Sequence, residues 1–166
     1  MKKFYALFIS FIMLVNCMPL PAAAAEPDPV GVSVIYQDWG ESVPVFEDAM
    51  YGLSTTADVH NLEDSNMTIY TTISGEGTFQ TGLCKTNTTK IYVEFDLNRD
   101  ASVKIELLDS AGNSLAETTL TYYLLDERTP TIKFTNLTSS KNYSIKITNN
   151  SQNQIKVLGS VRDSLF

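Results

Sequence analysis

Short stretches in which apolar and polar residues alternate recur along most of this chain. In the clearest of them Ile91, Val93, Phe95 and Leu97 are separated by single residues that are mostly polar. Side chains of an extended strand point alternately to its two faces, so a period of two indicates a strand with one buried face. Strands are also predicted in eight further stretches: residues 30–37, 67–73, 78–84, 103–107, 115–125, 131–136, 143–148 and 155–161.

The segments between these stretches have the composition of turns. The Gly-rich sequence at 74–77 predicts a hairpin loop between two strands, and the sequence at 109–113 predicts a second tight turn. No 11-residue stretch keeps a helical period. Strands spaced by roughly 8–12 residues, with turn residues between them, predict an all-β sandwich or barrel.

One segment is similar to a motif of known sandwiches. Leu137 precedes Tyr143 by six residues, and Tyr143, Ile145 and Ile147 then alternate with polar residues. This resembles the tyrosine corner of fibronectin type III and related immunoglobulin-like domains, in which the phenol hydroxyl hydrogen bonds to backbone upstream. The resemblance implies an immunoglobulin/fibronectin-III-like antiparallel β-sandwich. A jelly-roll-type sandwich is the alternative.

The alternation also predicts which side chains form the core. The members are the apolar residues on one face of the predicted strands, together with the corner tyrosine. They are Ile69, Ile91, Val93, Phe95, Val103, Ile105, Leu107, Ile132, Phe134, Tyr143, Ile145 and Ile147.

Residues 1–25 have the features of a signal peptide. Lys2 and Lys3 precede an apolar stretch at 4–15, and small residues end the segment at Ala23 and Ala25. Twelve residues are fewer than the roughly 20 that cross a bilayer, so we predict cleavage before Glu26 and no membrane insertion of the mature chain. The expected location is outside the cell or at the cell envelope, and the short Met-Lys-Lys start suggests a bacterial source.

A second processing site gives an alternative to this cleavage. Residues 14–17 resemble a bacterial lipobox, which implies a lipoprotein anchored through Cys17, although Asn16 stands where that motif has Gly, Ala or Ser. Cleavage before Glu26 leaves Cys84 as the remaining cysteine, so the mature chain has no internal disulfide.

Charge is unevenly distributed along the chain. Residues 26–84 contain ten acidic and no basic residues, whereas residues 85–166 contain ten basic and nine acidic ones, so the mature chain carries a net charge of −9. Such a field repels phosphates, which excludes nucleic acid as a partner. We expect residues 26–66 to be an acidic segment with a first strand and irregular loops, forming one domain with the main sandwich at 67–166.

Motifs for catalysis are sparse. The chain has one histidine, His60, which Asp58 or Cys84 would have to complement, and it has no Gly-x-Ser-x-Gly sequence. The leading expectation is therefore a non-catalytic protein that acts by binding or structural association with an unknown protein or glycan. A small secreted hydrolase that uses acidic loop residues is an alternative.

Aromatic residues suggest a carbohydrate-binding module as another alternative. Sugar rings stack on exposed aromatic side chains, and the candidates are Trp39, Tyr36, Tyr122 and Tyr123. No cofactor is predicted apart from a weak calcium site. Its candidate ligands are Asp58, Glu63, Asp64 and Asn66, closely spaced oxygen donors of the kind that calcium prefers.

Overall fold

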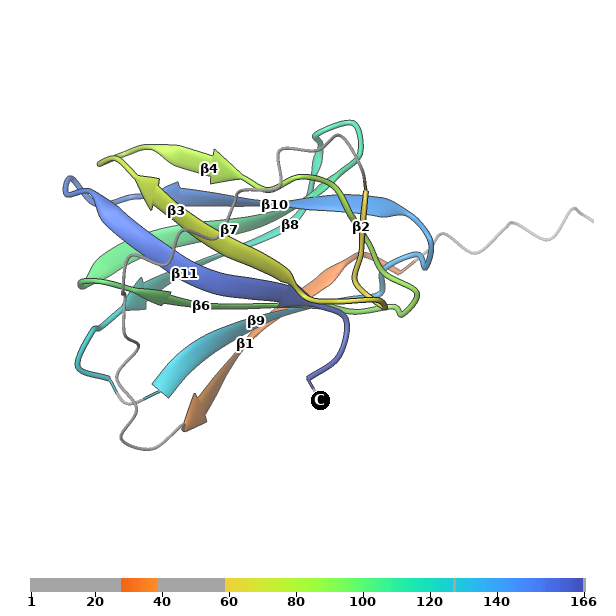
Figure 1. The fold of residues 1–166 in the computed structure, drawn as a ribbon, viewed down its shortest axis with the longest axis horizontal. Coiled ribbons are helices and arrows are strands. Elements are labelled where there is room, and N and C mark those ends of the chain that lie inside the picture. Colours follow the sequence, from red (N-terminus) through yellow and green to blue (C-terminus); the bar gives the residue numbers. More distant parts are fainter. Residues whose placement is uncertain (1–27, 39–58, 127, 166) are drawn as a thin grey trace, which may run out of the picture.

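The computed structural model describes residues 28–38, 59–126 and 128–165, which form strands and turns and contain no helix. The strands make two sheets (Figure 1). The first sheet has the order β1 (Gly31–Asp38), β9 (Arg128–Thr135), β6 (Ile91–Leu97), β11 (Ile155–Arg162) and β3 (Met67–Ile73). The second has the order β2 (His60–Asn61), β5 (Cys84–Lys85), β10 (Asn142–Asn149), β7 (Ala101–Asp109) and β8 (Ser114–Tyr122), and β4 (Thr78–Gln80) also pairs with β10.

The hydrophobic core lies between the two sheets. All twelve residues predicted for the core are buried, so the buried face that the alternation predicts for these strands is confirmed. Phe95 and Phe134 are the largest of the fully buried side chains. Partly buried valines of β1 pack against the edge of this core. The predicted all-β sandwich is therefore confirmed.

The order of the strands corrects the immunoglobulin-like prediction. β7 and β8 form a hairpin, β6 pairs with β9, β10 pairs with β4 and β5, and β11 pairs with β3. This nested pairing is one long hairpin wrapped across two sheets, which is the jelly-roll arrangement given as the alternative. In an immunoglobulin-like domain the last two strands are neighbours in one sheet, whereas here β10 and β11 belong to different sheets.

The tyrosine corner itself is present. The Tyr143 hydroxyl donates a hydrogen bond to the Thr138 carbonyl at 3.0 Å and accepts one from the Thr138 N–H at 3.0 Å. Burial raises the pKa of Tyr143. The motif needs only a buried tyrosine beside an upstream turn, so its presence does not specify the order in which the strands pair.

The structure also corrects the prediction of a hairpin at residues 74–77. The Gly77 N–H donates to the Ser74 carbonyl at 3.0 Å, and Glu76 has a φ of 56°, so the chain does turn there. However, β3 pairs with β11 in the first sheet and β4 pairs with β10 in the second. The turn therefore carries the chain from one sheet to the other, because turn residues determine where a chain reverses and not which strand lies beside it.

Candidate functional site

Exposed apolar side chains gather at one end of the sandwich. Six large hydrophobic residues are exposed in the described ranges, and four of them are Tyr36, Tyr123, Leu124 and Leu125. Figure 1 shows the β8–β9 loop at the same end as the last residues of β1. Leu125 is 93% exposed and Tyr123 is 57% exposed. We call these four residues the end surface.

Hydrogen bonds hold the loop that carries three of these residues. The Leu124 N–H donates to the Asp100 carboxylate at 2.7 Å, and the Asp126 N–H donates to the Tyr123 carbonyl at 3.0 Å. The Arg128 guanidinium donates two bonds of 3.0 Å to the Asp126 carboxylate and lowers the pKa of Asp126. The apolar side chains therefore project from a loop whose backbone is fastened at several points.

Tyr36 is connected to the same loop from the neighbouring sheet edge. It lies opposite Pro130 in the register of β1 with β9. The Arg128 guanidinium carbon lies 5.2 Å from the centre of the Tyr36 ring, a cation–π contact. Two of the predicted ligand-binding tyrosines, Tyr36 and Tyr123, thus lie at one end of the molecule.

Tyr122 does not share that surface. Its side chain is only 5% exposed, and its hydroxyl donates to the Asp96 carboxylate at 3.4 Å, to which the Thr129 hydroxyl also donates at 3.1 Å. Burial raises the pKa of Asp96, and burial together with the nearby Asp96 charge raises the pKa of Tyr122 to about 12. Tyr122 supports the loop from the core, and Trp39 lies outside the described residues.

The sequence predicts one strand through residues 115–125 and therefore does not identify Leu124 and Leu125 as exposed loop residues. The strand ends at Tyr122 in the structure. The sequence does contain a sign that the strand ends here, because four consecutive apolar residues at 122–125 break the alternation of apolar and polar positions. Such a break indicates that the residues have left the pleated strand, where neighbours face opposite ways.

The predicted calcium ligands make hydrogen bonds within their own region. The Glu63 carboxylate accepts a bond from the Asn87 amide, and the Asp64 carboxylate accepts one from the Asn61 amide at 2.9 Å. Asn66 is exposed, and Asp58 lies outside the described residues. Within residues 28–38, 59–126 and 128–165, no three His, Cys, Asp or Glu side chains are grouped as metal ligands would be.

His60 and Cys84 are register partners on the adjacent parallel strands β2 and β5. The His60 Nε2 donates to the Ser65 carbonyl at 2.8 Å. The Cys84 thiol is fully buried, and this burial raises its pKa to about 12. A nucleophilic cysteine needs a lowered pKa, so this pair has the opposite electrostatics from an activated thiol dyad.

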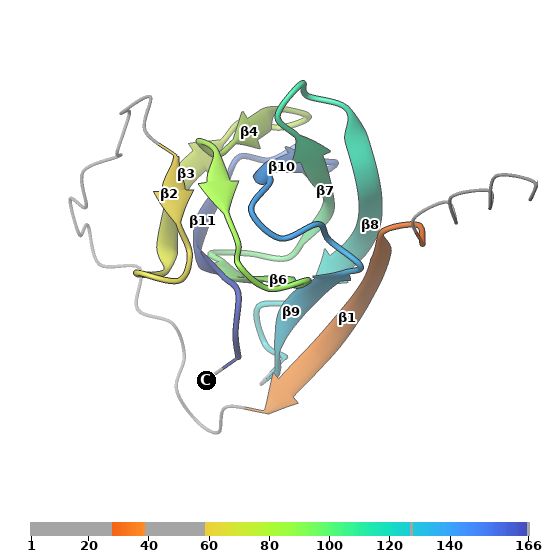
Figure 2. The same cartoon turned by 90° about the vertical axis from the view of Figure 1, so that its right-hand side faces the viewer.

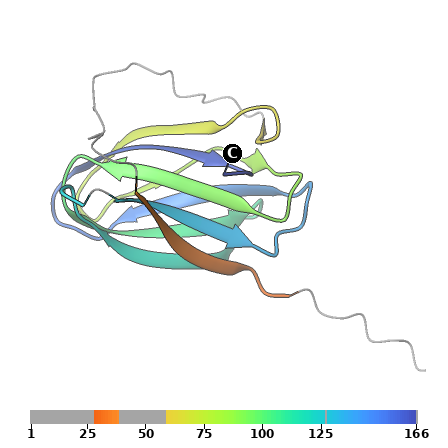
Figure 3. The same ribbon diagram turned by 90° about the horizontal axis from the view of Figure 1, so that it is seen from below.

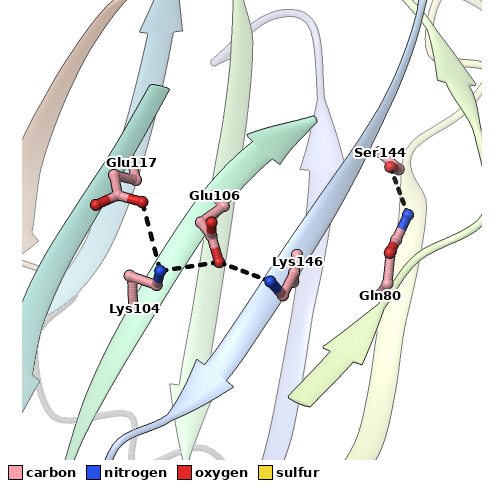
Figure 4. Close-up of polar contacts among 6 residues, drawn as sticks. All are labelled: Gln80, Lys104, Glu106, Glu117, Ser144 and Lys146. Atoms are coloured by element: carbon pink, nitrogen blue, oxygen red, sulfur yellow. Dashed lines mark hydrogen bonds and ion pairs between the residues drawn. The ribbon is translucent and has the colours of Figure 1, made fainter. Parts of the chain in front are cut away.

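A network of charged side chains crosses the outer face of the second sheet (Figure 4). The Glu106 carboxylate lies 3.2 Å from both Lys104 and Lys146, and Lys104 lies 3.4 Å from Glu117. Burial raises the pKa of Glu106, but the two ammonium groups outweigh it and the net shift is downward. Two positive and two negative groups balance here, so the network has no net charge to attract an ionic ligand.

Comparisons with known proteins place no further constraint on this site. The chain matches no protein-family model, and no similar sequence was found among curated proteins. The part of the chain that the structure describes contains no apolar helix of membrane-spanning length.

Proposed function

We propose that this protein is an exported, non-catalytic binding module that contacts a partner protein through the end surface. The observation that carries the proposal is the exposure of Leu125, Leu124 and Tyr123 on a loop fastened by Asp100 and Asp126. Contiguous exposed apolar side chains mark interaction sites in soluble proteins. A fastened loop also loses little conformational freedom on binding, which favours recognition.

The composition of the end surface favours a protein partner over a small polar ligand. Leucine side chains offer no hydrogen bonds, so their burial is favourable only against another apolar surface. Tyr123 adds an aromatic ring of the kind that dominates binding energy at protein interfaces. The ion pair of Asp126 with Arg128 supplies a charged rim beside the apolar residues.

A photo-crosslinking amino acid at position 125 tests this proposal. The matched control is position 115, because Leu115 is also an exposed leucine and lies at the far end of β8, about 23 Å from Tyr122 at 3.3 Å per strand residue. Irradiation of cells that export the protein should give adducts of discrete mass from position 125 and none from position 115. An excess of the Leu125→Asp variant without the crosslinker, added as a competitor, should reduce labelling from position 125 less than an excess of the Leu115→Asp variant does. Equal labelling from the two positions would refute the proposal.

A carbohydrate ligand is the second candidate. Tyr36 and Tyr123 present partly exposed rings at one end, and Asp126 and Arg128 provide hydrogen-bonding groups beside them. A glycan array separates the two candidates. Sugar binding should be lost in Tyr123→Ala and retained in Leu125→Asp, whereas protein binding should be lost in both variants.

The export step depends on the predicted signal peptide, residues 1–25. N-terminal sequencing of the protein recovered from outside the cytoplasm should begin at Glu26. Intact mass provides the alternative outcome, since a diacylglyceryl group on Cys17 would show that the chain is a lipoprotein.

A further inference from the structure

Strand β1 is an addition to the jelly roll and belongs to none of its nested strand pairs. The four nested pairings are complete without it, and β1 extends the first sheet by pairing with β9 alone. All eight residues of β1 have a partner on β9, from Gly31 opposite Thr135 to Asp38 opposite Arg128. Figures 2 and 3 show β1 running along the edge of the sandwich.

The side of β9 that receives β1 is built as a docking edge. Ile132 and Phe134 of β9 are fully buried, and Val34 and Val32 lie opposite them. Without β1, the backbone N–H and C=O groups along one side of β9 would be exposed, and such an edge pairs readily with another strand. The β9 edge therefore requires a strand, and the hydrogen bonds do not depend on which molecule supplies it.

Strand β1 itself is lightly held. Its described side chains, from residues 31 to 36, are all exposed or only partly buried, in contrast to the fully buried residues that they contact. Strands with little buried apolar surface open with a lower free energy than the core does. Detachment of β1 would leave the nested jelly-roll pairs in place.

The chain after β1 is long enough for β1 to reach a second molecule. Residues 39–58 separate Asp38 from the next described segment, which begins at Val59. Twenty residues span at most about 70 Å when extended, whereas a nine-residue strand such as β7 is about 30 Å long. The connection therefore does not restrict β1 to the β9 edge of its own chain.

We propose that β1 exchanges between copies of this protein, so that β1 of one molecule pairs with β9 of another. The eight residue pairs and the valine contacts are the same in both arrangements, so exchange needs no new interface. The balance between the two arrangements depends on the protein concentration relative to the effective concentration that the length of the linking chain sets. Head-to-tail exchange would link successive copies into chains.

Disulfide trapping tests the proposal in the full chain. Ser33 and Lys133 lie directly opposite each other on β1 and β9, at a separation that suits a disulfide. The double variant Ser33→Cys/Lys133→Cys should form an intramolecular bond, which checks the geometry. Mixing the two single variants at high concentration under mild oxidation should give a mixed disulfide dimer, because a bond between the two chains then requires exchange.

The control mixture pairs Ser33→Cys with Thr119→Cys, an exposed position on β8 of the other sheet. Exchange predicts several-fold more mixed dimer from Ser33→Cys with Lys133→Cys than from the control, and an excess of a peptide of residues 28–38 should suppress it. Equal yields from the two mixtures, with no effect of the peptide, would overturn the proposal. Leu125→Asp should leave the yield unchanged, so failure here is distinguishable from failure of the proposed binding function.

Discussion

Glu106 is expected to contribute to stability far more than Glu117, although both carboxylates contact Lys104. The Glu106 side chain is 6% exposed and lies between two lysines, whereas the Glu117 side chain is 56% exposed and contacts one. Glu106→Gln keeps the shape of the side chain and removes the charge. Because the two lysines are partly solvated, we expect a loss of roughly 1–2 kcal/mol for Glu106→Gln, against about 0–1 kcal/mol for Glu117→Gln.

Urea denaturation at pH 7 measures both losses, and the pH dependence identifies their origin. The lowered pKa of Glu106 means that its contribution is fully present above the pKa of the unfolded chain, about 4.3, and is lost as the pH falls through the folded value. The difference between wild type and Glu106→Gln should therefore be largest near pH 7 and shrink below about pH 4. Equal losses for the two variants, or a difference unchanged in acid, would refute the reasoning.

Three further predictions concern the core, the tyrosine corner and the acidic region. Phe95→Ala should lower the free energy of unfolding by roughly 3–5 kcal/mol because it empties a fully buried site; the exposed control Thr119→Ala should stay within about 0.5 kcal/mol in the same denaturation assay. Tyr143→Phe should cost about 1 kcal/mol, since it removes the hydroxyl that bonds to Thr138. The calcium hypothesis predicts that millimolar calcium raises the melting temperature more than magnesium does, and that Asp64→Asn abolishes the difference; equal shifts would reject the site.

The strands and the core could be predicted from the sequence because they depend on local alternation. Val93, Phe95 and Leu97 are buried by the same period of two that marks them in the sequence. The partners of each strand could not be predicted in this way. Whether β10 lies beside β11 or beside β7 depends on contacts between residues far apart in the chain, and the local tyrosine corner at Tyr143 is compatible with either order.

In the candidate site, too, the residue types could be predicted from the sequence, whereas their positions depend on contacts between residues far apart in the chain. Tyr36 and Tyr123 are candidates because they are aromatic, and the structure places both at one end of the sandwich, where the Arg128 guanidinium lies over the Tyr36 ring. Tyr122 is the last residue of β8 and is buried, whereas Tyr123 lies beyond the end of the strand and is exposed, and where the strand ends could not be predicted from the sequence. The sequence predicts that the strand continues through Leu125, so it does not indicate that this residue is the most exposed apolar side chain of the end surface.

The nested pairing of the strands has a consequence for when the protein can fold. Residues paired between β3 and β11 are between 82 and 94 positions apart in the sequence, and β1 must wait for β9. Contacts of this range make folding slow, because long stretches of chain must be ordered before they form. During synthesis from the N-terminus, β3 therefore remains without its partner until residues 155–161 have appeared. Only the hairpin of β7 and β8 can form early, and the remaining pairs are expected to assemble outward from it.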